Sequence, residues 1–343
     1  MDTGTLAFPG ATKLAQTAAD HINKDLGGIH GRQVELVTCD LKNDEAAAQQ
    51  CGQQFANDKK MLAAIVPMDI FGAPFYPSLV GAGKPVLGGL PIGATSGTTD
   101  DAHYFYPGNA AFASSLIKWM IDQPGVKKVT LFRSGDPSTV EFIKIITKAL
   151  EGAGIAVNDQ TVPVGSANLV SSVVAGEAKD ADLIYAGNPG GCVALTEAFK
   201  SLKFTPKQVL AQTSCADPAV VAEKPEAYEG WTVANPIAIP SAGGEDADEL
   251  NAAWKKYGAG GAVPTYGEVG WGNLMTLASI LEGMPEADVT DTAKITKAIA
   301  SFTGPVNLGA EKVACPGPTL PFVCSEAASF YDVAADGSLS LEK

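Results

Sequence analysis

The sequence predicts an α/β protein made of two parallel-sheet lobes. Three observations lead to this prediction. Apolar strand patterns alternate with helical patterns along the chain, as in parallel sheets. The 343 residues exceed the size of a single hydrophobic core. Aromatic, Pro and Asn residues interrupt the alternation near 104–109 and 231–240, which we interpret as two of the crossovers.

The helical segments show apolar residues at intervals of about four, with glycine at their ends. In the first helix, Leu14, Ala18 and Ile22 form one apolar face, and Gly27 supplies the C-terminal stop. On the same criteria we expect further helices over residues 43–58, 138–150, 169–176, 193–202, 246–256, 267–281 and 292–300.

The strands show either continuous apolar runs or alternation. Residues 61–66 form a run typical of a strand buried on both faces, whereas residues 33–38 alternate between apolar and polar. Further strands are expected over residues 126–132, 155–162, 181–186, 208–211 and 329–333. The resulting division assigns 1–108 and 236–314 to lobe one, and 109–235 and 315–343 to lobe two.

Composition excludes several classes of protein. The chain is 46% hydrophobic and 18% charged, which is typical of a globular protein. A formal net charge of −14 without any Lys/Arg cluster opposes binding to nucleic acids and to anionic membranes. No apolar run is long enough to span a bilayer, and no signal segment is recognised. Residues 1–5 resemble the end of a strand whose apolar part is absent, so we expect residues upstream of Met1.

The six cysteines include no Cys-x-x-Cys pair and have no neighbouring histidine, so we expect no metal site. Their even number and spacing favour the disulfides Cys39–Cys51, Cys192–Cys215 and Cys315–Cys324. The sequence does not choose among the possible pairings, and buried free thiols are the alternative. Disulfides would indicate an extracytoplasmic protein.

Catalytic motifs are missing from the sequence. It contains no phosphate-binding Walker loop, no His-Glu-x-x-His and no Gly-x-Ser-x-Gly, and residues 81–86 depart from the dinucleotide fingerprint. The three histidines are scattered. We therefore expect no enzyme activity, no catalytic residues and no cofactor.

Residues 20–40, with Gly27-Gly28 and Gly31-Arg32 in their turn, resemble the first helix, turn and second strand of type I periplasmic binding proteins. That family includes the branched-chain amino-acid (leucine) binding proteins of ABC transporters. The similarity continues through residues 63–67, 83–87 and 229–231, and so spans nearly the whole chain.

The resemblance implies two doubly wound, parallel-sheet lobes joined by three crossovers. It also implies a monomer, periplasmic or lipid-anchored at the cell surface, that closes the two lobes on a small molecule and delivers it to an ABC permease. An extracellular or amide-type sensing domain with the same fold is the alternative function. In open parallel sheets ligands bind at the carboxyl ends of the strands, which selects the candidate loops.

The candidate ligand contacts fall in both lobes. In lobe one they are Phe8, Asp69, Ile70, Phe71, Gly89, Leu90, Pro91 and Trp271. In lobe two they are Asp136, Ser138, Asn188, Pro189, Ser214 and Asp217. The first loop of lobe one is expected over residues 68–72 and the second over 88–92.

Three of these positions differ from the pattern of amino-acid-binding relatives. In amino-acid-binding relatives, the loop at the place of residues 69–71 resembles a run of small hydroxyl residues that holds the ligand carboxylate. Ser214 stands at the place of the ammonium-binding acid, and Ser138 at the place of an aromatic residue. These differences predict a ligand that is larger or more apolar than valine, not a standard α-amino acid, and oriented by Asp69.

Several of the candidates have structural alternatives. Ile70 and Phe71 are equally consistent with core positions. Asp69 and Asp217 are consistent with helix N-caps, and for Asp217, which precedes Pro218, the cap is the favoured reading. Trp271 is consistent with packing between a helix and a sheet.

Overall fold

The computed structural model describes residues 8–42, 44–70, 73–93, 95–135, 137–163, 165–187, 191–212, 215, 221, 224–264 and 266–342. The chain divides into two compact units. Unit 1 contains residues 1–111 and 236–327, and unit 2 contains residues 112–235 and 328–343. The chain thus passes from one unit to the other three times.

The tail was expected to join lobe two from residue 315, but residues 315–327 belong to unit 1. The reason is backbone pairing beside β3 (His103–Tyr104). The Tyr104 N–H donates to the Phe322 carbonyl at 2.9 Å, and the Cys324 N–H donates to the Tyr104 carbonyl at 2.8 Å. This pairing holds the segment in unit 1 before the chain returns to unit 2.

Unit 1 has a three-stranded parallel sheet in the order β1-β2-β3, with β1 at Ala64–Asp69 and β2 at Val86–Pro91. The helices of this unit are α1 (Pro9–Lys24), α2 (Glu45–Asn57), α3 (Tyr76–Gly81), α9 (Glu245–Tyr257), α10 (Gly267–Glu282) and α11 (Thr292–Ala300). Short 3₁₀ turns lie at Pro240–Ala242 and Glu286–Asp288.

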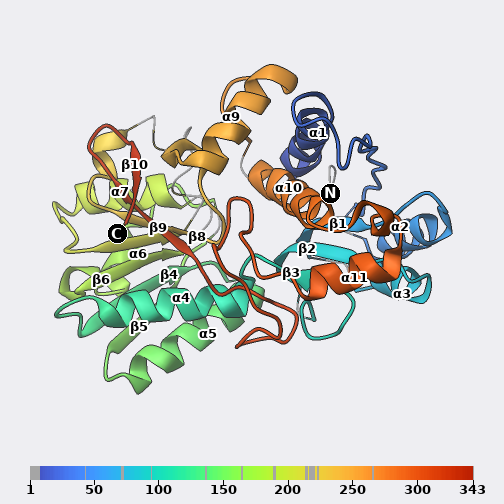
Figure 1. The fold of residues 1–343 in the computed structure, drawn as a ribbon. Coiled ribbons are helices and arrows are strands. Elements are labelled where there is room, and N and C mark those ends of the chain that lie inside the picture. Colours follow the sequence, from blue (N-terminus) through green and yellow to red (C-terminus); the bar gives the residue numbers. More distant parts are fainter. Residues whose placement is uncertain are drawn as a thin grey trace. The chain divides into compact units, whose positions relative to one another are not determined.

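Strands β1, β2 and β3 are labelled in Figure 1, and two separate hydrophobic clusters pack against them. Leu87 of β2 lies in the cluster that contains Leu14 of α1 and Leu274 of α10. Val66 of β1 lies in the cluster that contains Leu79 of α3. Strand residues alternate between faces, so successive side chains of the two strands reach both clusters.

Helices α1 and α10 touch through glycine. A Cβ atom added to Gly270 would lie 1.9 Å from the Ala11 carbonyl oxygen, and one added to Gly10 would lie 2.8 Å from the Pro264 side chain. Only glycine permits backbones to approach this closely. The first turns of both helices are therefore pressed together.

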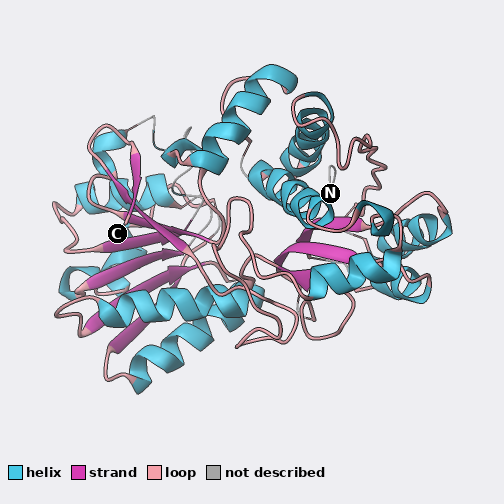
Figure 2. Cartoon of the chain, in the orientation of Figure 1, coloured by secondary structure: helices cyan, strands magenta, loops and turns pink. Residues whose placement is uncertain are grey.

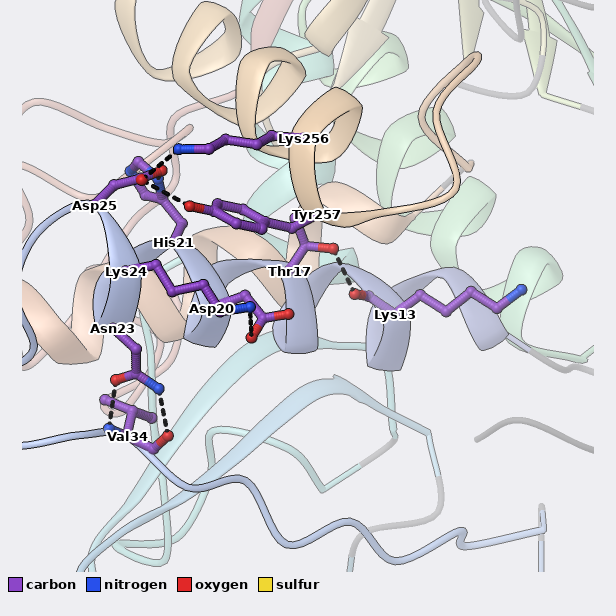
Figure 3. A network of polar contacts seen from close by, with 10 residues as sticks. All are labelled: Lys13, Thr17, Asp20, His21, Asn23, Lys24, Asp25, Val34, Lys256 and Tyr257. Atoms are coloured by element: carbon purple, nitrogen blue, oxygen red, sulfur yellow. Dashed lines mark hydrogen bonds and ion pairs between the residues drawn. The ribbon is translucent and has the colours of Figure 1, made fainter.

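Residues 33–38, expected as a strand, form no strand in the structure. The Asn23 side chain of α1 takes the place of a neighbouring strand. Its amide nitrogen donates to the Val34 carbonyl at 2.8 Å, and its oxygen accepts from the Val34 N–H at 2.7 Å (Figure 3). The expected alternation is present, since Val34 and Leu36 are half-buried between exposed neighbours.

A charged network joins the end of α1 to the end of α9 (Figure 3). Asp25 accepts from the Lys256 ammonium and from the Tyr257 hydroxyl, each at 2.6 Å. The two ring nitrogens of His21 face Asp25 and Glu249, each at 2.9 Å. Lys256, followed by Tyr257 and His21, holds the pKa of Asp25 well below its ordinary value.

Unit 2 has a seven-stranded sheet in the order β10-β9-β8-β7-β6-β4-β5, whose strands lie side by side in Figure 2. The pairs of β8 and β10 with β9 are antiparallel, and the other neighbouring pairs are parallel. The strands are β4 (Lys128–Arg133), β5 (Ala156–Thr161), β6 (Leu183–Gly187), β7 (Val209–Gln212), β8 (Thr232–Asn235), β9 (Ser329–Val333) and β10 (Leu339–Leu341).

The helices associated with this sheet are α4 (Asn109–Asp122), α5 (Pro137–Gly152), α6 (Val170–Ala175) and α7 (Cys192–Ser201). Turns of 3₁₀ type lie at Ala178–Asp180 and Pro225–Ala227. A core cluster forms around Leu131, Ile146 and Leu183, with Leu116 of α4 packed into it. Helix α4 was not predicted, because its segment follows directly on the presumed first crossover.

The expected α/β class is confirmed, and most expected elements occur within a few residues of their predicted ends. The strand expected at 61–66 begins three residues later, at Ala64, and runs to Asp69. Strand β8 occupies part of the second presumed crossover.

The structure forms the three expected disulfides, Cys39–Cys51, Cys192–Cys215 and Cys315–Cys324. Their Cα–Cα distances are 5.7, 5.6 and 4.7 Å. The alternative of free thiols is therefore wrong. Among the described helices, none combines the length and the apolar character needed to cross a bilayer.

Replacing Asn23 with Ala is expected to lower the free energy of unfolding by about 1–3 kcal/mol, since two half-buried backbone groups of Val34 lose their partners. Urea denaturation of the variant and of Gln16→Ala measures this effect. Gln16 is an exposed residue of the same helix and is the control. A loss no larger for Asn23→Ala than for Gln16→Ala would contradict the role given to Asn23.

Asp25 is expected to contribute to acid sensitivity. Its folded-state pKa lies below the usual 3.8, so its stabilising effect is present above that pH and is lost as the pH falls further. Melting curves recorded from neutral to acidic pH should show a smaller drop in Tm for Asp25→Asn than for the unchanged protein. Parallel curves would show that the network contributes nothing to stability.

Candidate functional site

Asp69 is the last residue of β1, and its side chain is buried inside unit 1 with 1% exposure. The Ser96 hydroxyl donates to its Oδ2 atom at 2.6 Å, and the Tyr104 hydroxyl donates to the same atom at 2.5 Å. The hydroxyl oxygens of Tyr76 and Tyr104 are 2.9 Å apart. We refer to Asp69, Tyr76, Ser96 and Tyr104 as the Asp69 cluster.

The Asp69 backbone ties the end of β1 to the loop after β2. The N–H groups of Ile92 and Gly93 both donate to the Asp69 carbonyl, at 3.0 and 2.6 Å. Burial, with the negative charge of Asp69, raises the pKa of the Tyr76 and Tyr104 hydroxyls well above the ordinary value. Both hydroxyls therefore stay protonated, and the Tyr104 hydroxyl can donate to the carboxylate.

Four of the five residues expected in the second loop, Gly88–Pro91, belong to β2 instead. Gly89, Leu90 and Pro91 continue the parallel ladder as far as the pair Asp69↔Pro91. Leu90 is 3% exposed and lies in the core. Their apolar character reflects a strand buried on both faces.

Ile70 follows β1 directly and is half-buried. Phe71 lies outside the described residues. Sequence reasoning missed Tyr76, Ser96 and Tyr104, because nothing in their local spacing connects them with Asp69.

Trp271 is fully buried in α10 and belongs to the core cluster shared with α1. Its ring centroid lies 5.5 Å from that of His21. This is the packed position that the sequence left open as the alternative to a ligand contact.

Phe8 contacts Tyr266, an aromatic residue that the sequence analysis did not identify. The Phe8 ring meets the Tyr266 ring edge to face, with centroids 5.4 Å apart. Both residues are partly exposed. Glu268, two residues beyond Tyr266 in the first turn of α10, is 4% exposed. We refer to Phe8, Tyr106, Tyr266 and Glu268 as the Glu268 cluster.

Glu268 is a buried carboxyl without a cationic neighbour in the described part of the chain. Burial raises its pKa to about 7, and only its own backbone N–H opposes that shift. Burial and the nearby Glu268 charge together raise the pKa of Tyr266 to about 12. Glu268 also adds to the raised pKa of Tyr106, which burial chiefly causes.

The Glu268 cluster lies at the carboxyl ends of the strands of unit 1. Tyr106 comes two residues after the end of β3. Its hydroxyl packs against Gly272, one turn beyond Glu268, so closely that a Cβ atom on Gly272 would lie 2.2 Å from it. Val269, the next residue in α10, lies against Gly89 near the end of β2. Parallel sheets bind ligands at this edge.

The candidates expected from lobe two fall largely where no geometry is described. Asp136, Asn188, Pro189, Ser214 and Asp217 lie outside the described residues. Ser138 lies in α5, but its side chain is not among those described.

The Cys192–Cys215 disulfide crosslinks two loops of unit 2. Cys192 begins α7 after β6, and Cys215 lies three residues past the end of β7. The bridge therefore ties together two chain segments that follow neighbouring parallel strands.

A polar hollow of about 490 Å³ lies elsewhere in unit 2. Its lining residues include Val126, Asp182 and Gln208, each of which directly precedes a strand or lies within two residues of one. It therefore opens at the amino ends of the strands, away from the edge where parallel sheets bind ligands. Asp182 is already paired with Lys207 at 2.8 Å.

Possible metal ligands were considered separately. Nowhere in the described segments do three or more His, Cys, Asp or Glu side chains gather as a metal site would require.

Solved structures of other proteins share this fold. A substrate-binding protein of an ABC transporter from Desulfitobacterium hafniense, in complex with Leu, has a TM-score of 0.71 at 17% identity, covering 97% of this chain and 95% of that one. The leucine-binding protein LivK from Thermotoga maritima has a TM-score of 0.70 at 18% identity, covering 100% and 95%.

The branched-chain amino-acid transporter substrate-binding protein LivJ from Streptococcus pneumoniae, in complex with isoleucine, has a TM-score of 0.72 at 18% identity, covering 100% of this chain and 97% of that one. No curated protein sequence matches the chain. The family model described as "Periplasmic binding protein" matches residues 2–315. The chain, with its two parallel-stranded units and three crossings, belongs to the periplasmic binding protein family.

Proposed function

We propose that this protein captures a small organic molecule between its two units outside the cytoplasm and delivers it to the permease of an ABC importer. The observation that carries the proposal is the family match over residues 2–315. The three structural relatives described above support it, because each is described as a transporter substrate-binding protein or a leucine-binding protein. The three disulfides support the extracytoplasmic location.

The mechanism follows from thermodynamic linkage. A ligand that touches both units binds the closed form more tightly than the open form, and only this difference in affinity shifts the equilibrium towards closure. The closed form is then the state that the permease recognises. We propose that the protein acts as a monomer, without a cofactor and without catalysis.

We further propose that the ligand is not a standard α-amino acid. The proposal is supported by the residues at the end of β1. Residues 69–71 stand where the relatives' pattern has small hydroxyl residues, so a ligand carboxylate lacks its usual anchor here. Asp69 is buried and bonded to Ser96 and Tyr104, so we assign it the positioning of the loop after β2.

A thermal-shift screen tests the proposed function. A ligand present at about 100 times its Kd stabilises the folded protein by about 2.7 kcal/mol, so one chemical class should raise the Tm by several degrees. The panel contains amino acids, amines, small amides, aromatic acids, sugars and sterol-derived acids, applied to protein refolded to remove any carried ligand. No shift with any class would count against a binding protein, and tight binding of leucine or valine would overturn the proposed ligand class.

Replacing Asp69 is expected to weaken binding more than replacing Asp217. Asp69→Asn keeps the volume of the side chain but removes the charge that accepts two hydroxyl hydrogen bonds, a change of about 1–3 kcal/mol. Isothermal titration with whichever ligand the screen identifies compares Asp69→Asn and Asp69→Ala with Asp217→Ala. Equal changes in Kd for the two positions would contradict the ranking.

A further inference from the structure

A turn at residues 306–310 is held by four other segments of unit 1. The Gly309 N–H donates to the Val306 carbonyl at 2.9 Å, and the Val306 N–H donates to the Ala310 carbonyl at 3.0 Å. We refer to these five residues as the 306–310 turn. Leu308 has a φ of 57°, in the left-handed region that favours glycine. A strained residue of this kind persists only where its surroundings hold it in place.

Asn307 is held from two sides. Its N–H donates to the Thr276 hydroxyl of α10 at 3.1 Å, and its carbonyl accepts from the Tyr106 hydroxyl at 2.6 Å. Thr276 is 1% exposed, and Tyr106 is fully buried. Glycine leaves room for Tyr106, since a Cβ atom on Gly272 would lie 2.2 Å from its hydroxyl and one on Gly309 would lie 3.0 Å from its ring. Because water is excluded here, losing either hydrogen bond would leave a buried polar group without a partner.

Leu308 is held in the same way. Its N–H donates to the Asp246 carboxylate of α9 at 2.6 Å, and its carbonyl accepts from the Ala238 N–H at 2.8 Å. Its side chain is 2% exposed and belongs to the core cluster that contains Leu274. The partners of the turn thus fix the left-handed conformation that a leucine would otherwise avoid.

Two of these partners lie next to crossings between the units. The first crossing follows residue 111, and the second follows residue 235. Tyr106 comes five residues before the first crossing, and Ala238 is the third residue after the second. The 306–310 turn therefore links the two chain segments by which unit 1 is connected to both ends of the stretch 112–235.

The third crossing follows residue 327 and is linked to the first through backbone pairing. Tyr104 pairs with Phe322 and Cys324, as described above, and the Cys315–Cys324 disulfide closes the same segment on itself. Hydrogen bonds and short stretches of chain within unit 1 thus connect the third crossing to the first, and the first through the 306–310 turn to the second.

We propose that the 306–310 turn is the common base of a hinge, which couples the unit 1 ends of the first and second crossings so that they respond together when unit 2 moves. Tyr106 and Asp246 are positioning residues of this base, because each holds one residue of the turn. The left-handed Leu308 supports this role, since strained residues concentrate at parts of proteins that switch between conformations. The coupling stands without the proposed function, whereas its use in closing on a ligand rests on that function.

Hydrogen exchange of single amides tests the coupling. Tyr106→Phe removes one of the four hydrogen bonds, and the amides of Ala238 and Leu308 are read, neither of which the substitution alters chemically. Because the turn is held as a whole, both amides should exchange at least about tenfold faster in the variant. The control is Tyr257→Phe, which removes another hydroxyl donor of unit 1, the one that donates to Asp25. Unchanged exchange at Ala238 in Tyr106→Phe, or equal acceleration in the control, would overturn the coupling.

A second variant separates the coupling from a general loss of stability. Asp246→Ala removes the acceptor of the Leu308 N–H, and it should accelerate exchange at Ala238 as the first variant does. Asp248→Ala removes the same charge from an exposed side chain of the same helix and should change nothing. Leu131, in the core of unit 2, is the internal reference. Acceleration there equal to that at Ala238 would overturn the proposal.

The distance between the units is a readout that a purely local role of the turn would not change. Spin labels are attached through non-natural amino acids, which spare the disulfides, at the exposed residues Gln49 of α2 and Lys148 of α5. Pulsed EPR of the ligand-free protein should give a broader distance distribution for Tyr106→Phe, because the crossings no longer share one base, and no change for Tyr257→Phe. Equal widths in both variants and in the unchanged protein would overturn the hinge role.

Failure of this inference is distinct from failure of the proposed function. Neither exchange nor EPR uses a ligand, so a thermal-shift screen without any stabilising compound would reject ligand capture and leave the coupling to be decided by these two measurements. Conversely, unchanged exchange and unchanged distances in a protein that the screen shows to bind a ligand would reject the hinge base alone.

Discussion

The close contact between α1 and α10 is the constraint on which the helical face of unit 1 depends. At Gly270 the helix backbones approach so closely that a single methyl group would lie 1.9 Å from the Ala11 carbonyl oxygen. One residue earlier in the same turn, Val269 lies against Gly89 of β2, so the start of α10 packs on both α1 and the sheet. It also brings the residue before α1, Phe8, against the residue before α10, Tyr266.

Asp69 and Glu268 are both buried acids of unit 1, but they differ in their hydrogen-bond partners. Asp69 has two hydroxyl donors within 2.6 Å, which compensate the loss of water around its charge. Glu268 has no such donors among the described residues, and burial raises its pKa to about 7. The two acids therefore differ in their surroundings: hydroxyl groups donate to the first, whereas burial favours the protonated form of the second.

Much of the fold was predictable from periodicity, because helices and buried strands leave apolar repeats of different length. Helix α11 and strand β9 were predicted with the ends that the structure has. The strand expected at 33–38 does not form. The Asn23 side chain makes the hydrogen bonds to the Val34 backbone that a neighbouring strand would otherwise make. Residues 315–327 were misassigned because their pairing with Tyr104 crosses a long stretch of sequence.

The candidate site was less predictable, since burial and partners are properties of three-dimensional packing. Asp69 and Phe8 were selected from their place after and before expected elements. Glu268 was missed, although the sequence carries a signal for it. It is the only charged residue between Gly267 and Leu281 in an otherwise apolar helix, and an unexplained acid in such a helix is a candidate for function.

Each of the three disulfides joins consecutive cysteines within one unit, over separations of 12, 23 and 9 residues. During export, each bridge can close as soon as its own short segment has emerged, without waiting for later cysteines. Pairing in order of synthesis gives the native set without any isomerisation step. No bridge joins the two units, so each crosslink restricts the unfolded chain of its own unit only.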